Sequence, residues 1–320
     1  MEELSSVLVG LYAAARKVPM AEFQDAALAL VQSLVGFTSA AWGVGRILAD
    51  GLRHHSVHLV GDPPDRLMDY KEVKHRDTAA FATENNPGRA FSFHAPILFC
   101  EAEVSGTCEY AGRCEHQCYI LASRLDGDSG LLHWIGVYRG DADERYGDAD
   151  RRTMELLLPH LDEALSINRT LNLARENADG EGAQAIVDRF GVLHHAGPGF
   201  LELVQREWPR SDGRDLPSPL TERLGRVPGD RYVGRTIVVR ARPIRDLLLL
   251  HARPRMSVDD LTPRQLAVAQ SVAGGLPYKE IAQRLGLSTA TVRNYAQAAH
   301  ERLGVHSRHE LTAQLKAAGL

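Results

Sequence analysis

Apolar residues recur every three or four positions through the last sixty residues of the chain, 261–320, and glycines interrupt the pattern. Such spacing puts each apolar set on one face of a helix, so the segment predicts four short helices. Thr262, followed by a proline, opens the first, and Ser288 and Ser307 open the third and fourth, because a hydroxyl there accepts an unpaired backbone N–H. We therefore expect an all-α domain of four helices at 257–320.

A tight turn at Gly286 separates the second and third predicted helices, which is typical of a helix-turn-helix. The third helix, from Thr289 to about Leu303, begins with polar residues. Short hydroxyls and backbone N–H groups at a helix start hold phosphates, and Arg293 and Asn294 have side chains that reach base edges. The candidate DNA-contacting residues are Thr262, Lys279, Ser288, Thr289, Thr291, Arg293, Asn294, Tyr295 and Arg308.

Four short motifs fall at fixed places in this segment. They are LTPR at 261–264, GLPYKEIA at 275–282, TVRN at 291–294 and LGVHSR at 303–308. With these motifs the segment resembles the LuxR-type DNA-binding domain, which implies that double-stranded DNA is a partner. Two residues depart from the family pattern, because Gln265 stands where Glu is usual and Tyr295 stands where His is frequent. We expect the first to weaken a polar contact and neither to change the fold.

The first 173 residues alternate between helical and strand patterns. Apolar residues at helical spacing predict one or two helices over 2–36, and two alternating runs around the pair Asp50–Gly51 predict a β-hairpin. Residues 90–99 and 130–138 predict further extended segments. This order of helix, hairpin and antiparallel strands resembles a GAF-like domain. We therefore expect an α+β sensor region whose first domain is 1–173.

A long amphipathic helix is predicted over 148–173. Its portion LLPHLDEAL resembles the signalling helix that closes the sensor domain in many LuxR-type regulators, and such helices pair between subunits. Pro159 inside the pattern predicts a kink. The alternative is a helix that packs only on its own sheet. The residues expected to form a dimerisation seam are Met154, Leu158, Leu161 and Leu165.

Residues 174–256 predict a smaller second domain together with linkers. The stretch 174–184 is polar and contains glycines, as a linker does. A strand–turn–strand over 185–195, a short helix with Phe200, and two later strands resemble a PAS domain, although the segment is short for one. The alternative is a β-rich spacer without a pocket. A last linker is predicted at 254–260.

All four cysteines lie within one segment, where Gly106 and Gly112 predict an irregular loop. Clustered thiols in a cytoplasmic protein are more often metal ligands or redox centres than structural disulfides. Four thiolates suit zinc or an iron–sulfur cluster, although the spacing matches neither a zinc ribbon nor a common ferredoxin. Reversible thiol oxidation and unligated cysteines are the alternatives. The candidate metal ligands are Cys100, Cys108, Cys114 and Cys118, and His116 has the chemistry to replace one of them.

Length and charge limit the kind of protein. The chain has 320 residues, room for two or three domains, and a net charge of −4, so DNA affinity has to come from local charge. The C-terminal domain is only slightly positive, and we therefore expect a homodimer that reads two half-sites of an inverted repeat. Neither a run of about 18 apolar residues nor a signal-peptide order of charges occurs, which predicts a cytoplasmic protein without a membrane partner.

The sequence lacks a phosphate-binding loop and a Ser/His/Asp nucleophile motif, so we do not expect an enzyme. We expect a sequence-specific transcriptional regulator whose N-terminal domain senses a small ligand of unknown identity, or metal or redox state through the four cysteines. Two alternatives belong to other classes. One is a metal- or thiol-dependent enzyme domain fused to a DNA-binding domain, and the other is a partner-binding module that DNA tethers.

Overall fold

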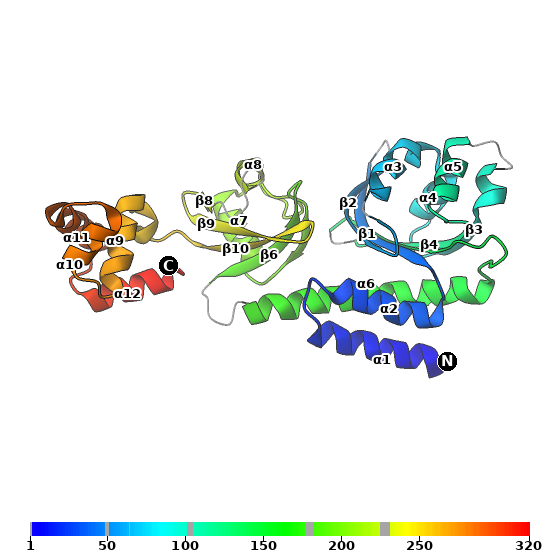
Figure 1. Cartoon of the computed structure of the whole chain (residues 1–320), viewed down its shortest axis with the longest axis horizontal. Coiled ribbons are helices and arrows are strands. Elements are labelled where there is room, and N and C mark those ends of the chain that lie inside the picture. The colour runs from blue at the N-terminus through cyan, green and yellow to red at the C-terminus, as the bar shows by residue number, and fades with distance from the viewer. Residues whose placement is uncertain are drawn as a thin grey trace. The chain divides into compact units, whose positions relative to one another are not determined.

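The computed structural model describes residues 2–48, 51–63, 65–100, 105–127, 129–176, 182–224 and 231–320. The chain divides into two compact units (Figure 1). The N-terminal unit comprises residues 1–172, 188–195 and 244–247, and the C-terminal unit comprises 173–187, 196–243 and 248–320. An α+β region with two five-stranded sheets precedes an all-α region, as the sequence predicts. Among the described helices, none combines the length and the apolar character that crossing a bilayer requires.

The first sheet is antiparallel and has the strand order β2-β1-β5-β4-β3. Its strands are β1 (Ser39–Leu48), β2 (Gly51–Val60), β3 (Ala90–His94), β4 (Cys118–Leu125) and β5 (Leu132–Arg139). β1 and β2 form the predicted hairpin, with Trp42 opposite His58, while Asp50 of the expected turn lies outside the described residues. The extended segment expected over 90–99 ends early, because Pro96 begins a short helical turn, η2 (Pro96–Cys100).

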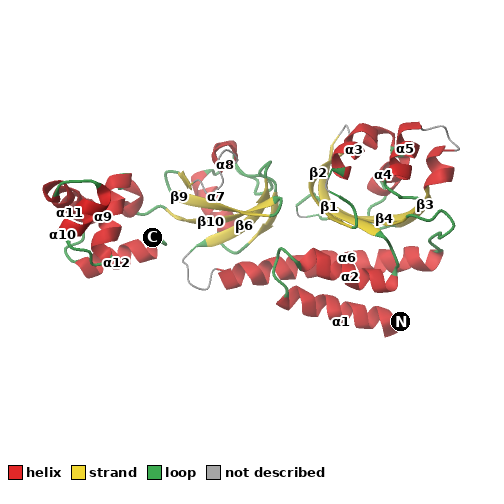
Figure 2. Ribbon diagram, viewed as in Figure 1, coloured by secondary structure: helices red, strands yellow, loops and turns green. Residues whose placement is uncertain are grey.

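The two faces of this sheet have different neighbours, since side chains alternate along each strand. Helices α1 (Glu2–Lys17), α2 (Phe23–Leu34) and α6 (Asp148–Glu176) cover one face (Figure 2). The other face carries α3 (Arg66–Val73), η1 (Lys74–Arg76), α4 (Thr78–Glu84) and α5 (Ser105–Arg113). Trp42, Ile120 and Ile135 enter the helix-covered core together with Leu11 and Phe23. The main core of the unit therefore lies between the sheet and three helices.

Helix α6 spans 29 residues, contains Pro159 and includes the predicted range 148–173. Met154, Leu158, Leu161 and Leu165 all belong to the core under the first sheet. Each is at most 4% exposed within a single chain, so these side chains are not free to form the seam between subunits that we expected. The apolar stripe packs on its own sheet and on α1 and α2 instead.

The cysteine segment contains a helix where we expected an irregular loop. Helix α5 covers Ser105–Arg113, and β4 then begins at Cys118. Cys108 and Ala111, three residues apart, both pack in a cluster with Phe99 and Tyr119. A helical turn is the conformation that puts residues at this spacing on one face, so tertiary packing selects it.

The second sheet has the strand order β7-β6-β10-β9-β8. Its region contains β6 (Ala183–Asp188), β7 (Leu193–Ala196), α7 (Phe200–Glu207), α8 (Ser218–Leu224), β8 (Arg231–Val233), β9 (Ile237–Ile244) and β10 (Leu247–Pro254). The predicted strand–turn–strand, the helix with Phe200 and the two late strands are present, whereas α8 and β8 were not predicted. Of the expected linker 174–184, residues 177–181 lie outside the described residues. The PAS-like interpretation and the domain boundaries stay predictions.

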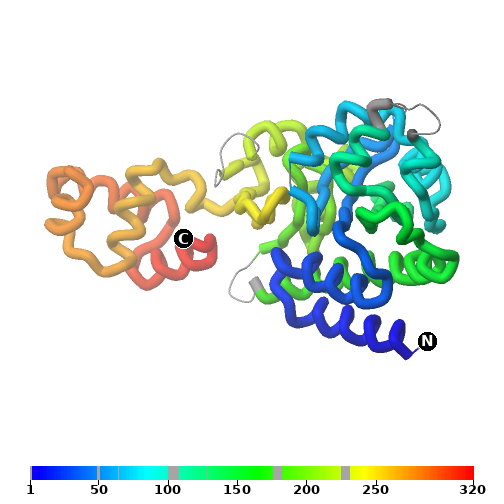
Figure 3. Tube along the Cα trace, turned by 45° about the vertical axis from the view of Figure 1, so that its right-hand side comes forward, coloured from blue at the N-terminus to red at the C-terminus, as the bar shows by residue number. Residues whose placement is uncertain are grey.

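The four predicted C-terminal helices are confirmed as α9 (Pro263–Ala273), α10 (Tyr278–Leu285), α11 (Thr289–Leu303) and α12 (Arg308–Ala317), and η3 (Ser257–Asp260) precedes them (Figure 3). Thr262 caps α9, because its Oγ1 accepts the N–H of Gln265 at 3.3 Å. Gln265 Oε1 in turn accepts the N–H of Thr262 at 3.0 Å. The glutamine that departs from the family pattern therefore still completes a capping box.

We predict that Leu161→Ala lowers the free energy of unfolding by about 2–5 kcal/mol, because it leaves a cavity in a dry core. Leu161 is fully buried, whereas Leu156 on the same helix is 58% exposed. The matched control Leu156→Ala should therefore stay within about 0.5 kcal/mol of the wild type. Urea denaturation of the full chain, followed by tryptophan fluorescence, measures both. A loss at Leu156 as large as that at Leu161 would contradict its assignment to solvent.

Candidate DNA interface and ligand pocket

The turn between α10 and α11 depends on Gly286, whose φ of +66° lies in the left-handed region that ends helices. Ser288 then caps α11, because its Oγ accepts the N–H of Thr291 at 3.0 Å. The two hydroxyl oxygens of Ser288 and Thr291 lie 2.8 Å apart. Val292 and Ala296 bury the inner side of α11 against α9 and α10. The other side of α11 is left for an external partner.

The outer side of the helix-turn-helix carries most of the predicted contacts. Arg293 and Asn294 are exposed, about one turn after the capped end of α11. Ser288 and Thr289 are exposed at that end, and Lys279 is exposed in the first turn of α10. A helix start with free N–H groups, hydroxyls and cations nearby is an arrangement that binds phosphate.

Three other predicted contacts have partners within the chain. Tyr295 is half-buried and packs on the cluster that contains Ile281. Arg308 donates from Nε to the carbonyl of Ala273 at 3.2 Å, at the end of α9, where the unpaired carbonyls attract positive charge. Thr262 uses its hydroxyl in the cap of α9. For these three residues, as for the other six, a contact with DNA stays a prediction.

A cavity of about 110 Å³ lies in the N-terminal unit, on the face of the first sheet that carries α3, α4 and α5. Strand alternation creates its floor, because Tyr119 and Trp134 point toward it while their neighbours Ile120 and Ile135 enter the core. The aromatic residues that line the cavity are Tyr70, Phe99, Tyr110, Tyr119, Trp134 and Tyr138.

Two ring nitrogens in this wall, Trp134 Nε1 and His54 Nδ1, are buried and lack a hydrogen-bond partner among the described residues. The two rings are 5.2 Å apart in a T-shaped arrangement. Burial, followed by the charges of Lys74 and His55, lowers the pKa of His54 to about 4, so this ring is neutral at pH 7. The indole N–H of Trp134 is a donor only. The wall of the cavity therefore contains a donor that no described group accepts.

A carboxyl group also lines the cavity, at Asp77. It accepts a hydrogen bond from the hydroxyl of Tyr70 at 2.9 Å and another from the N–H of Ala80 at 3.0 Å, at the start of α4. Burial raises the pKa of Asp77. Both oxygens of Asp77 therefore already have a partner.

A second polar group borders the cavity at His116. Its Nε2 lies 2.8 Å from Asp62 Oδ2 and 3.3 Å from Ser39 Oγ, and its ring stacks on Tyr138 at 3.8 Å. Burial alone would raise the pKa of Asp62, but the hydrogen bond and charge of His116 outweigh it and lower the pKa. Ser39 and Asp62 contact the same ring nitrogen, so His116 does not sit between a nucleophile and an orienting carboxylate as a catalytic base does.

The structure divides the described cysteines between two places. Cys118 is buried in the helix-covered core, and its Sγ lies 3.5 Å from the carbonyl of Ala142. Cys108 packs in the cluster on the opposite face, Cys114 is buried one residue after α5, and the Cys100 side chain lies outside the described part. The described residues contain no group of three or more His, Cys, Asp and Glu side chains that could hold a metal ion. Metal binding, thiol oxidation and unligated thiols all stay predictions.

A comparison with protein families matches one part of the chain. The bacterial regulatory proteins of the luxR family match residues 259–315. This range contains the whole of α9, α10 and α11 and most of α12, and with them the exposed start of α11. The family resemblance predicted from the sequence motifs is therefore confirmed for this domain. No curated protein sequence matches the chain.

Several solved structures are similar to parts of the chain. The N-acylhomoserine lactone-dependent LuxR family factor CepR2 of Burkholderia cenocepacia is 16% identical, with a TM-score of 0.39 over 54% of this chain and 99% of its own. Escherichia coli SdiA is 13% identical, with a TM-score of 0.39 over 98% of each chain. A phycoerythrobilin-bound GAF domain from a cyanobacterial phytochrome is 13% identical, with a TM-score of 0.35 over 52% of this chain and 96% of its own. Scores this low carry no argument, so the family assignment rests on residues 259–315.

His54 makes the stability of the N-terminal unit depend on pH. An unfolded histidine binds a proton below about pH 6.5, whereas His54 binds one only below about pH 4. Because the unfolded state binds more protons between these values, the free energy of unfolding falls as the pH drops through them. We predict that His54→Gln reduces this fall by up to about 3 kcal/mol. Urea denaturation at pH 7 and at the low end of the window measures it.

The matched control for this prediction is His75→Gln, which changes an exposed histidine of the same unit. It should leave the pH dependence of unfolding as it is in the wild type. Equal losses of stability on acidification in His54→Gln and in the control would show that His54 does not cause the pH dependence.

Proposed function

We propose that this chain, whose residues 259–315 form a LuxR-family DNA-binding domain, regulates transcription by binding specific DNA sequences. The observation that carries the proposal is the exposed, polar start of α11 within the matched residues. The second helix of a helix-turn-helix enters the major groove with its N-terminal residues toward the bases. In α11 those residues are the ones that the inner core leaves exposed.

The side chains of this surface divide into two roles by their chemistry. Ser288, Thr289 and Lys279 suit the phosphate backbone, because hydroxyls, helix-start N–H groups and ammonium groups bind phosphate without reading sequence. Arg293 and Asn294 suit base edges, since a guanidinium pairs with guanine and an amide pairs with adenine. The first group would position the domain on DNA and the second would give it specificity.

Charge favours a homodimer on an inverted repeat. Residues 257–320 contain seven Lys and Arg against five Asp and Glu, so one copy neutralises few phosphates. Two copies on two half-sites double both the phosphate and the base contacts. The four buried side chains of α6 are unsuited to the subunit interface, so a homodimer would use another surface of the chain.

We propose that the cavity in the N-terminal unit binds the effector. Its aromatic wall suits an apolar molecule, and the unused N–H of Trp134 suits a hydrogen-bond acceptor such as a carbonyl or hydroxyl oxygen. A ligand that fits one arrangement of the sensor better than another shifts the population toward it. DNA affinity would then follow the concentration of a small molecule in the cytoplasm, the compartment that we expect for a DNA-binding regulator.

The cysteines remain a second candidate for the signal, proposed from their spacing in the sequence. Cys108 is part of the cluster that includes Phe99 and Tyr119, two residues that line the cavity. A metal ion or an oxidised thiol at this place would therefore alter the wall of the pocket. We favour a small ligand as the signal, because the described residues contain a cavity whose wall includes an unpartnered donor.

We predict that Arg293→Ala weakens binding to the preferred DNA site by about 1–3 kcal/mol and affects random duplex DNA less, because a base contact is lost. The matched control is Lys316→Ala, which removes one positive charge from an exposed position of α12. Fluorescence anisotropy at one fixed salt concentration compares the two DNAs. Equal losses on both would mean that Arg293 contacts only phosphate.

We predict that Trp134→Phe weakens effector binding by up to about tenfold, because it removes the indole N–H and keeps most of the ring. The matched control is Trp42→Phe, since Trp42 is buried in the core on the opposite face of the same sheet. Mass spectrometry of small molecules retained by each purified protein measures the difference. Equal retention by the two variants would mean that the ligand does not use the nitrogen of Trp134.

A further inference from the structure

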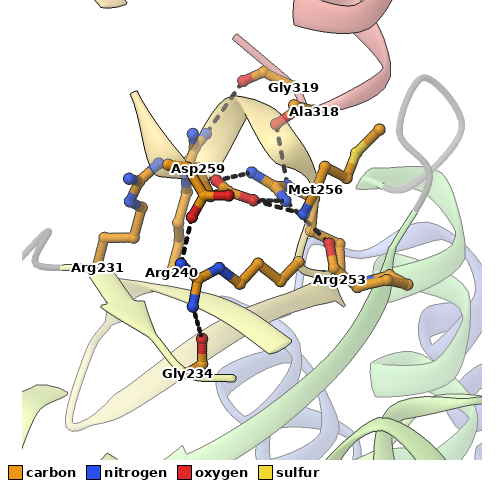
Figure 4. A network of polar contacts seen from close by, with 11 residues as sticks. Arg231, Gly234, Arg240, Arg253, Met256, Asp259, Ala318 and Gly319 are labelled. Atoms are coloured by element: carbon orange, nitrogen blue, oxygen red, sulfur yellow. Dashed lines mark hydrogen bonds and ion pairs between the residues drawn. The ribbon is translucent and has the colours of Figure 1, made fainter. Parts of the chain in front are cut away.

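The C-terminal end of α12 is held by two arginines of the second sheet (Figure 4). Arg240 of β9 donates from Nη1 to the carbonyl of Gly319 at 3.1 Å. Arg253 of β10 donates from Nε to the carbonyl of Ala318, also at 3.1 Å. The last carbonyls of a helix lack partners and carry partial negative charge, so guanidinium groups stabilise them. Two strands of the sheet therefore hold the last helix of the DNA-binding domain.

Arg253 also forms a buried ion pair with Asp259 of η3. Its two terminal nitrogens donate to the two carboxylate oxygens, each at 2.6 Å. The side chain of Asp259 is fully buried and that of Arg253 is 11% exposed. A pair with two parallel hydrogen bonds fixes the orientation of both groups as well as their distance.

Further partners keep the buried carboxylate charged. Arg231 of β8 lies 3.4 Å from Asp259 Oδ1, and the N–H of Met256 donates to Oδ2 at 2.9 Å. Burial alone would raise the pKa of Asp259, but the hydrogen bonds of Arg253 and Met256 and the charges of both arginines outweigh it and lower the pKa. This compensation holds only while η3 stays against the sheet, since a buried carboxylate without partners is strongly destabilising.

Asp259 and its neighbours also belong to the body of the DNA-binding domain. Val258 and Leu261 pack in one core with Leu311 and Leu315 of α12. The segment 254–260, which we predicted to be a linker, is therefore packed into the domain and tied to the sheet.

A second set of contacts runs beside the first and reaches α11. Arg255 donates to the carbonyl of Gly234 at 2.8 Å and forms an ion pair with Asp260. Arg302, near the end of α11, donates to the carbonyl of Asp260 at 2.8 Å. Polar contacts therefore lead from the strands of the second sheet through η3 to the helix that carries the candidate base-reading residues.

We propose that the arginine clamp, defined as Arg231, Arg240, Arg253 and Asp259, fixes the DNA-binding domain to the second sheet, so that a displacement of the sheet moves α11. A flexible linker would let the domain reorient freely and would transmit nothing, whereas a fixed joint makes DNA affinity depend on the state of the sheet. The regulatory half of this inference rests on the proposed function. The mechanical half does not, because it concerns contacts within the chain.

Hydrogen–deuterium exchange of the full chain tests the mechanical half. In Asp259→Asn, amides in 256–261 and 315–320 should exchange on the order of a hundredfold faster, because the buried arginines lose their charged partner. Amides in the middle of α11 should keep their protection. The matched control is Glu301→Gln, the same chemical change at an exposed position of α11. Equal exchange at 315–320 in the two variants would overturn the clamp.

A second variant separates the clamp from general unfolding. Arg253→Met combined with Asp259→Leu replaces the ion pair with apolar groups, which restores stability in many buried pairs. The double variant should keep protection within α9–α11 and show fast exchange at 315–320, because it lacks the hydrogen bond from Arg253 to the carbonyl of Ala318. Slow exchange at 315–320 in this variant would mean that the arginine does not hold α12.

The regulatory half is tested by fluorescence anisotropy with duplex DNA of random sequence. Asp259→Asn should change its affinity by about fivefold or more relative to Glu301→Gln, because the released domain is free to adopt the arrangement that DNA favours. An unchanged affinity with faster exchange would overturn the regulatory half and leave the mechanical half standing. Failure of the wild type to bind any duplex DNA would instead overturn the proposed function.

Discussion

Alternation of side chains across the first sheet is the constraint on which the N-terminal unit depends. Ile135 enters the core that α1, α2 and α6 cover, and its neighbour Trp134 faces the cavity. The same relation holds for Ile120 and Tyr119. The strands that stabilise the unit therefore also form the wall of the cavity. A displacement of that wall would therefore also displace the core under α6.

The C-terminal domain differs, because it has a small core and carries polar residues on its outer surface. Ser288 and Gly286 fix where α11 begins, and Val292 and Ala296 fix which side of it is buried. The outward direction of Arg293 follows from these local features. These local features do not fix the position of the whole domain. The buried ion pair of Arg253 with Asp259 contributes to that position by joining η3 to β10.

Features that depend on neighbouring residues could be predicted from the sequence. The four C-terminal helices and their caps at Thr262 and Ser288 were predicted correctly, because a cap and its partner lie three residues apart. Features that depend on residues farther along the chain were not predicted. Helix α5 is stabilised by packing on Phe99 and Tyr119, which the residues of the helix alone do not reveal. The dimerisation seam assigned to α6 illustrates the same limit, since an apolar stripe predicts that side chains such as Leu161 are buried but not which chain buries them.

In-vitro selection by the whole chain from a library of random duplexes tests most directly whether the chain recognises DNA sequence. We predict enrichment of one sequence arranged as an inverted repeat, with two half-sites about one helical turn apart. A final pool that binds no better than the starting library would contradict the account.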